Sequence, residues 1–221
     1  MRKDFGSNPW FYPLPVLIVG TYDAQGRPDA MNAAWGGLYD ANLVELCLSS
    51  GHKTYKNIQE KKAFTVSFGD AANVAACDYV GLVSGNNTPD KMEKSGLTAE
   101  KSAMVDAPLF QELPLTLECR FVRTTEEGNV IGEIVNISAD ERILGADGNI
   151  SMEKFRPSPL SRSTTATTFW AKRSATPSKP ATRWNKRPFS RPEAPSQESP
   201  GFCVSGTVYS EKSFLSFLEK Y

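Results

Sequence analysis

The sequence lacks the motifs that are typical of zinc sites and of serine hydrolases. It has a single histidine, His52, and its four cysteines have no Cys-x-x-Cys spacing, so no metal site is expected. There is also no Gly-x-Ser-x-Gly motif. A hydrolase triad built on Ser49 or Ser50 is therefore not expected.

Long apolar runs are absent as well. No run approaches the roughly 20 residues of a membrane span, and LPVLIVGTY (14–22) is too short and lacks the flanks of a signal peptide. We expect this run to be a strand and the protein to be cytoplasmic, with no membrane partner. Reduced, mostly buried thiols are then the simplest expectation for the cysteines.

The zero net charge hides two regions of opposite sign. Residues 1–157 carry 15 Lys/Arg against 21 Asp/Glu, whereas residues 158–221 carry 10 against 4. Between residues 158 and 200, Ser, Thr and Pro make up 21 of 43 residues, a composition that cannot bury enough apolar surface to fold. We therefore expect one domain at 1–157 and a low-complexity, basic, disordered tail at 158–221. The tail has no recognition motif, so no specific nucleic acid partner is expected.

Apolar and β-branched segments dominate the first region. VLIVGTY (16–22) and RPDAMNAAW (27–35) flank the turn DAQG and predict a hairpin, and LVELCLSS (43–50) predicts a third strand. TYKNIQEKK (54–62) has helical composition, and AFTVSF (63–68) predicts the next strand.

Later segments continue this pattern. Residues 70–85 are expected to start as a helix, followed by a loop at 84–91 that is rich in Gly, Asn and Pro. LPLTLECRFVRT (113–124) and VIGEIVNISAD (130–140) predict a long antiparallel hairpin. Its solvent face should carry three charged residues: Glu118, Arg120 and Glu133. Many strands joined by tight turns, with short helices, predict a mainly β, barrel-like domain.

The stretch SSGHKTYKNI (49–58) has the composition of an anion site. If Thr54 caps the helix, then backbone N–H groups, hydroxyls and the Lys53 ammonium can converge on one phosphate. The alternative is an ordinary loop that leads into a capped helix, in which His52 makes only a polar contact.

A second stretch, MNAAWGG (31–37), combines small residues with Asn32 and Trp35. Small side chains let a flat ring lie close to the backbone. The alternative is a strand end with a core tryptophan.

Taken in order, these stretches resemble the flavin reductase-like family, and its flavoredoxin members most closely. The matching segments are PLPVLIVGTYDAQGRPDAMNAAWGG, LSSGHKTYKNIQEKKAFTVSF, CDYVGLVSGNNTPDKMEKSGLT, APLFQELPLTLECRFV and GEIVNISAD, within residues 11–156. The resemblance implies an FMN-binding split β-barrel with Greek-key connections, in a homodimer.

The resemblance also implies site residues. Those beside the FMN ring would be Asn32, Ala33, Ala34 and Trp35. Those at the FMN phosphate would be Ser49, Ser50, His52, Lys53 and Thr54, with Asn57 nearby. On the nicotinamide or substrate side it implies, less specifically, Asp78, Gly81, Ser84, Gly85 and Lys91. No catalytic side chain is implied.

Three functions follow from the resemblance. The first is an oxidoreductase that passes electrons from NAD(P)H through flavin to an acceptor. The second is an FMN-binding electron carrier that exchanges electrons with a redox protein and has no NAD(P)H activity of its own. The third is a non-functional remnant, because the end of the chain departs from the family.

The departure begins after Pro157. Members of the family continue into a segment with a tyrosine pair and a glycine-punctuated helix, which this chain lacks. Back-translated one base out of register, residues 161–187 can be read as PVNNGYYVLGEKVGNAFKAGNALEQA, which resembles the missing segment. We interpret 158–221 as a frameshift product, whether from a sequencing error, a pseudogene or a real mutation. A genuine basic tail is the alternative.

Overall fold

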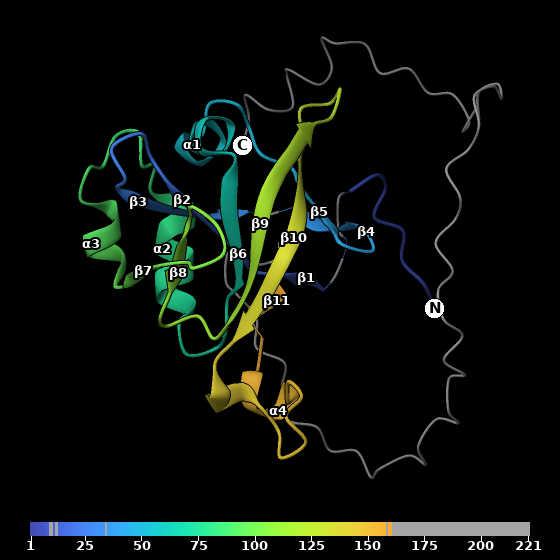
Figure 1. Cartoon of the computed structure of the whole chain (residues 1–221). Coiled ribbons are helices and arrows are strands. Elements are labelled where there is room, and N and C mark those ends of the chain that lie inside the picture. The colour runs from blue at the N-terminus through green and yellow to red at the C-terminus, as the bar shows by residue number, and fades with distance from the viewer. Residues whose placement is uncertain (9–10, 12, 34, 158, 161–221) are drawn as a thin grey trace, which may run out of the picture. The chain divides into compact units, whose positions relative to one another are not determined.

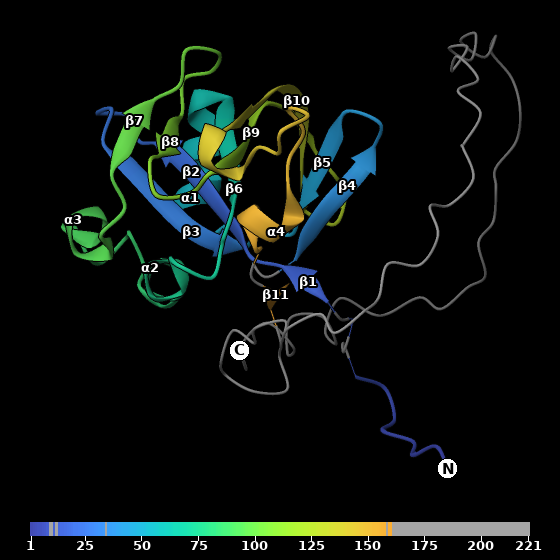
Figure 2. The same ribbon diagram turned by 90° about the horizontal axis from the view of Figure 1, so that it is seen from below.

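A curled, seven-stranded antiparallel sheet forms the centre of the domain (Figures 1 and 2). Its strand order is β3-β2-β6-β9-β10-β5-β4. In chain order the strands are β2 Leu17–Tyr22, β3 Pro28–Ala33, β4 Gly36–Asp40, β5 Leu43–Leu46, β6 Ala63–Phe68, β9 Leu115–Thr124 and β10 Val130–Ala139. The predicted mainly β fold is confirmed.

This computed structural model describes residues 1–8, 11, 13–33, 35–157 and 159–160. The predicted disordered, frameshifted tail at 158–221 lies outside the described residues, apart from Pro159–Leu160. That pair forms strand β11, which is antiparallel to β1 (Leu14–Pro15). The first and last described strands of the domain are therefore neighbours.

Two predicted hairpins are confirmed. β2 and β3 pair across a turn in which the Gly26 N–H donates to the Asp23 carbonyl, and Gly26 has a φ of +75° that favours glycine. β9 and β10 pair along almost their whole length, with two register shifts that mark bulges.

Two features of the sheet differ from the prediction. The expected strand at 43–50 ends at Leu46, and Gly36–Asp40 forms an additional strand, β4, that pairs with it. The two glycines of that segment argue against a strand on propensity alone. Gly36 is needed there because a Cβ at this position would lie only 2.8 Å from the Leu46 side chain.

The expectation that Glu118 faces solvent is wrong. Its side chain is 2% exposed, and it accepts hydrogen bonds from the Ser102 hydroxyl and from Asn136 Nδ2. Strand alternation correctly placed Glu118 and Arg120 on one face. However, the segment that carries Ser102 covers Glu118 and leaves Arg120 exposed.

Short helices and a small hairpin flank the sheet, and the core contains separate apolar clusters. One apolar cluster includes Val19, Leu46 and Phe64, and a second includes Ile18, Val80 and Phe110. The flanking elements are α1 Lys53–Lys61, α2 Val74–Leu82, α3 Lys91–Ser95, β7 Ala99–Lys101, β8 Pro108–Phe110, η1 Glu141–Ile143 and α4 Met152–Phe155. Helices α2 and α3 lie on the β3 side of the sheet, away from β4 (Figures 1 and 2). Among the described helices, none is both long and apolar enough to cross a membrane.

Candidate functional site

The N-terminal end of α1 lies where the sequence predicts an anion site. Ser49, Ser50 and His52 are exposed in the connection from β5. His52 is the N-cap residue, and no side chain within the described chain caps the helix there. The first N–H groups of a helix have no partner inside the helix, so they can bind an anion.

The prediction that Thr54 is the N-cap is wrong, because the helix begins one residue before it. Thr54 is 1% exposed, and its hydroxyl donates a 2.9 Å hydrogen bond to Asp29 Oδ2 in β3. Its side chain therefore attaches α1 to the sheet, and only its backbone N–H belongs to the open end of the helix.

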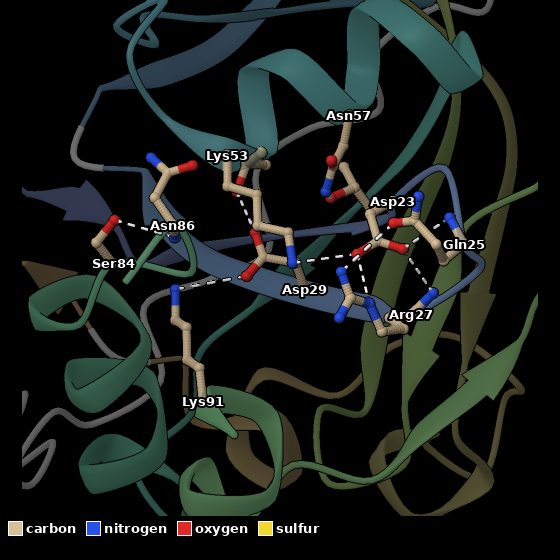
Figure 3. A network of polar contacts seen from close by, with 11 residues as sticks. Asp23, Gln25, Arg27, Asp29, Lys53, Asn57, Ser84, Asn86 and Lys91 are labelled. Atoms are coloured by element: carbon tan, nitrogen blue, oxygen red, sulfur yellow. Dashed lines mark hydrogen bonds and ion pairs between the residues drawn. The ribbon is translucent and has the colours of Figure 1, made fainter. Parts of the chain in front are cut away.

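Lys53 is also held by a carboxylate. Its ammonium lies 3.3 Å from Asp23 Oδ2 in the β2–β3 turn (Figure 3). Asp23 also accepts hydrogen bonds from the N–H groups of Gln25 and Arg27 and from Arg27 Nε. The turn and the start of α1 are thus joined by one carboxylate.

A third cation approaches from α3. Lys91 Nζ lies 3.8 Å from Asp29 Oδ1, and both side chains are buried. The backbone of Gly85 lies against Asp29 and Lys53, because a Cβ there would overlap Asp29 Oδ1 and lie 3.0 Å from Lys53 Cδ. Any larger residue at position 85 would displace the loop or the carboxylate.

These side chains form a network with an excess of positive charge. Three cations, Arg27, Lys53 and Lys91, face two carboxylates, Asp23 and Asp29 (Figure 3). One charge of this set is uncompensated within the network. The arrangement therefore favours an anion at the adjacent helix end.

The titration of the neighbouring groups follows from this arrangement. Although His52 is exposed, partial desolvation of its ring and then the Lys91 ammonium lower its pKa. For Asp23, burial raises the pKa, but the hydrogen bonds from Arg27 and Lys53 outweigh it and the pKa is lowered overall. At neutral pH the imidazole beside the network is therefore neutral.

Asn57 was expected near the phosphate, but its side chain points inward. It is 4% exposed and donates a 2.9 Å hydrogen bond to the Thr21 hydroxyl in β2. The side chain of Asn57 therefore fixes α1 against the sheet.

The segment expected beside a flat ring contains an unsatisfied acceptor. Asn32 Nδ2 donates to the Cys77 carbonyl over 3.4 Å, whereas Asn32 Oδ1 is buried with no hydrogen-bond partner among the described residues. Helix α2 packs closely here, since a Cβ at Gly81 would lie 2.9 Å from Asn32 Cβ. A buried acceptor without a donor is costly, and a ligand with an N–H or O–H group would satisfy it.

The other residues of this segment are placed differently. Ala33 is 1% exposed and packs in the core, so only its backbone can face a ligand. Trp35 is half-buried and its carbonyl accepts from the Cys47 N–H. Ala34 lies outside the described residues.

The loop between α2 and α3 meets the α1 end. Asn86 Nδ2 donates to the Gly51 carbonyl over 3.0 Å, and the Asn86 N–H donates to Ser84 Oγ. Ser84 and Gly85 are thus near the predicted phosphate loop, as Lys91 is. Asp78, in contrast, is exposed on α2, and within the described residues it forms no hydrogen bond or ion pair with the network.

Sequence reasoning missed the two carboxylates. Asp23 was read only as a turn residue, and Asp29 only as part of a strand. A signal was available for Asp29, because an acidic residue inside a strand of small and apolar residues requires a buried partner.

Within the described residues, no group of His, Cys, Asp or Glu side chains is arranged to hold a metal ion.

Comparison with known families gives a match over most of the domain. The model of the flavin reductase like domain matches residues 10–157. The chain belongs to this family. The resemblance inferred from its motifs is thereby confirmed.

Solved structures of flavin reductase-like proteins share the fold. Flavoredoxin of Desulfovibrio vulgaris (Miyazaki F) is 34% identical with a TM-score of 0.74, covering 80% of this chain and 97% of that chain. An FMN-binding domain of a flavin reductases-like enzyme from Shewanella baltica OS155 is 17% identical with a TM-score of 0.63, covering 73% and 89% respectively. The latter likeness shows the fold alone, and the split-barrel prediction is confirmed.

A relative from Aeropyrum pernix, an uncharacterized protein, is 27% identical over 151 residues. The match covers 66% of this chain and 56% of that protein. The chain therefore spans little more than half the length of this relative.

Proposed function

We propose that this chain binds FMN noncovalently and works as a flavin-dependent oxidoreductase, with NAD(P)H as the electron donor. The proposal rests on one observation above all. Within the described residues, a helix end without a side-chain cap lies beside a network with one excess positive charge, in a chain of the flavin reductase-like family.

The residues present fit the two ends of FMN. The N–H groups at the start of α1, with Ser49 and Ser50, would hold the phosphate. The unpartnered Asn32 Oδ1 would accept a hydrogen bond from the ring or the ribityl chain, and the Trp35 segment would lie beside the ring. When bound, FMN supplies the hydride and electron transfer chemistry; the chain binds and orients it.

The spectrum of the purified protein is the first test. We expect a yellow preparation that releases FMN on denaturation, and anaerobic NADH or NADPH should bleach its visible band. FMN uptake without bleaching would instead support the second candidate, an electron carrier that exchanges electrons with a redox protein. The 34% identity with a flavoredoxin favours that candidate. Failure to take up FMN would refute both and support a non-functional remnant.

The test needs a variant that separates binding from folding. Ser49→Ala/Ser50→Ala removes two exposed hydroxyls at the helix end, so the free energy of unfolding should change by less than about 0.5 kcal/mol. FMN affinity should fall, whereas affinity for riboflavin, which has no phosphate, should not.

We further propose that the protein is a cytoplasmic homodimer. Leu38 and Tyr39 are exposed large side chains on β4, the strand at one edge of the sheet, and such residues are suited to an interface. Leu38→Asp/Tyr39→Asp should convert a dimer to a monomer in sedimentation analysis.

A further inference from the structure

The most buried ion pair of the described chain lies beside the proposed phosphate site. The Lys91 and Asp29 side chains are 5% and 3% exposed, and the ammonium lies 3.8 Å from Oδ1. Oδ2 of the same carboxylate accepts the hydrogen bond from Thr54, the second residue of α1. Asp29 therefore joins β3, α1 and α3 at one point.

The other charged groups that face Lys91 are unfavourable to its charge. Lys53 on α1 is cationic, and its charge lowers the pKa of Lys91. His52, at the N-cap of α1, interacts with the same ammonium. On its own helix, Asp90 is engaged outward with Lys94 at 2.7 Å. Asp29 is thus the group that favours the charged form of Lys91.

We propose that Asp29 is a positioning residue which keeps the Lys91 ammonium charged and fixed beside the α1 end, so that recognition of the flavin phosphate depends on a carboxylate behind the site. This inference rests on the proposed FMN site. It concerns how the site retains its charge, rather than which groups touch the ligand.

A physical consequence distinguishes this role from a merely structural one. Burial lowers the pKa of Lys91, and Asp29 opposes that effect. Without the carboxylate, a buried amine next to other cations loses its proton at a much lower pH. Phosphate affinity must then fall as pH rises through the new pKa of Lys91, because the cation is lost.

The test compares FMN with riboflavin in wild type and Asp29→Asn. Asparagine keeps an oxygen that can accept from Thr54, so the substitution removes mainly the charge. The ratio of the riboflavin Kd to the FMN Kd is measured by flavin fluorescence between pH 7 and 9.5, where a phosphate monoester with a second pKa of about 6 stays doubly charged.

We expect the wild-type ratio to stay constant within about twofold. In Asp29→Asn the ratio should fall as pH rises. Above the pKa of Lys91 the fall should reach up to about tenfold for each pH unit, because one proton is lost per site. Asp90→Asn is the matched control, because it removes the partner of an exposed lysine on the same helix; its profile should be flat.

A rescue and a second variant complete the test. Asp29→Asn/Lys91→Arg should restore a flat profile, since arginine does not deprotonate in proteins. A flat profile in Asp29→Asn, with FMN bound normally by wild type, would overturn the inference and leave the proposed function intact.

If Asp29→Asn does not fold, Lys91→Met decides: an unchanged ratio of the two Kd values at pH 7 overturns the inference, and a fall of about fivefold or more supports it. Wild-type protein that binds no FMN refutes the proposed function and this inference with it.

Discussion

The Asn57 side-chain amide donates a hydrogen bond to the Thr21 hydroxyl 2.9 Å away, and both side chains are buried. This contact fixes the helix that presents the proposed phosphate site against the second strand of the sheet. A helix held in this way can keep its open end in one place before any ligand arrives.

Asn57→Ala should therefore act mainly on stability. The change leaves the buried Thr21 hydroxyl without its partner, so the free energy of unfolding should fall by about 1–3 kcal/mol, as measured by urea unfolding. Lys56→Ala, on the exposed side of the same helix, should change it by less than about 0.5 kcal/mol. Equal effects of the two substitutions would contradict this assignment.

Gly81→Ala tests the close packing of α2 on Asn32. Alanine favours a helix by about 1 kcal/mol over glycine, but the new Cβ would lie 2.9 Å from Asn32 Cβ, and overpacking costs about 1–3 kcal/mol. We expect unchanged or lower stability and weaker FMN binding, because Asn32 must move. Gly37→Ala, on strand β4, places its Cβ in open space and shows the effect of a glycine-to-alanine change without a clash. A gain of about 1 kcal/mol in Gly81→Ala would show that the position is not crowded.

The thiols should differ in reactivity. Burial raises the pKa of Cys77 and of Cys119 to about 12, so both should resist iodoacetamide in the folded protein at pH 8. The residue Cys47 is exposed, although its sulfur is partly buried. This partial burial and then the Glu45 carboxylate raise the pKa of the Cys47 thiol, but less than burial raises those of Cys77 and Cys119. In a Cys203→Ser background we expect one thiol to react, at a rate that rises with pH because the thiolate is the nucleophile. Rapid labelling of Cys77 or Cys119 would contradict their burial.

His52 is the sole histidine, so its NMR titration can be assigned without ambiguity. Burial and then Lys91 lower its pKa below 6.5. Lys91→Met should raise the midpoint, because a repelling charge is removed. A folded-state pKa below the unfolded value means that protonation disfavours the fold, so this contribution to stability is lost as pH falls below about 6.5. A midpoint above 6.5 in wild type would contradict the arrangement.

Much of the fold could be predicted because its signals are local. The apolar and β-branched runs in Leu17–Tyr22 and Ala63–Phe68, and the turn residues between the hairpin strands, predicted strands that the structure contains. Strand β4 was missed because its pairing depends on Gly36 fitting against Leu46. This is a contact between two strands, and the strand propensities of single residues do not predict such contacts.

The site could be predicted only in outline. Its location at the start of α1 followed from hydroxyls, glycine and lysine in one short stretch. The orientation of Thr54 and Asn57 did not, because both side chains are drawn inward by partners 25 and 36 residues away. The pairing of Asp29 with Lys91 is long-range as well, so a reading of neighbouring residues does not show it.

The pairing of β1 with β11 places Leu14 opposite Leu160. Because the two ends of the described domain meet, a short peptide could join them, and new termini could be opened elsewhere in the chain. The exposed turn at 126–127 between β9 and β10 is a suitable opening. A circular permutant of this kind would begin at the long hairpin and carry no sequence beyond residue 160.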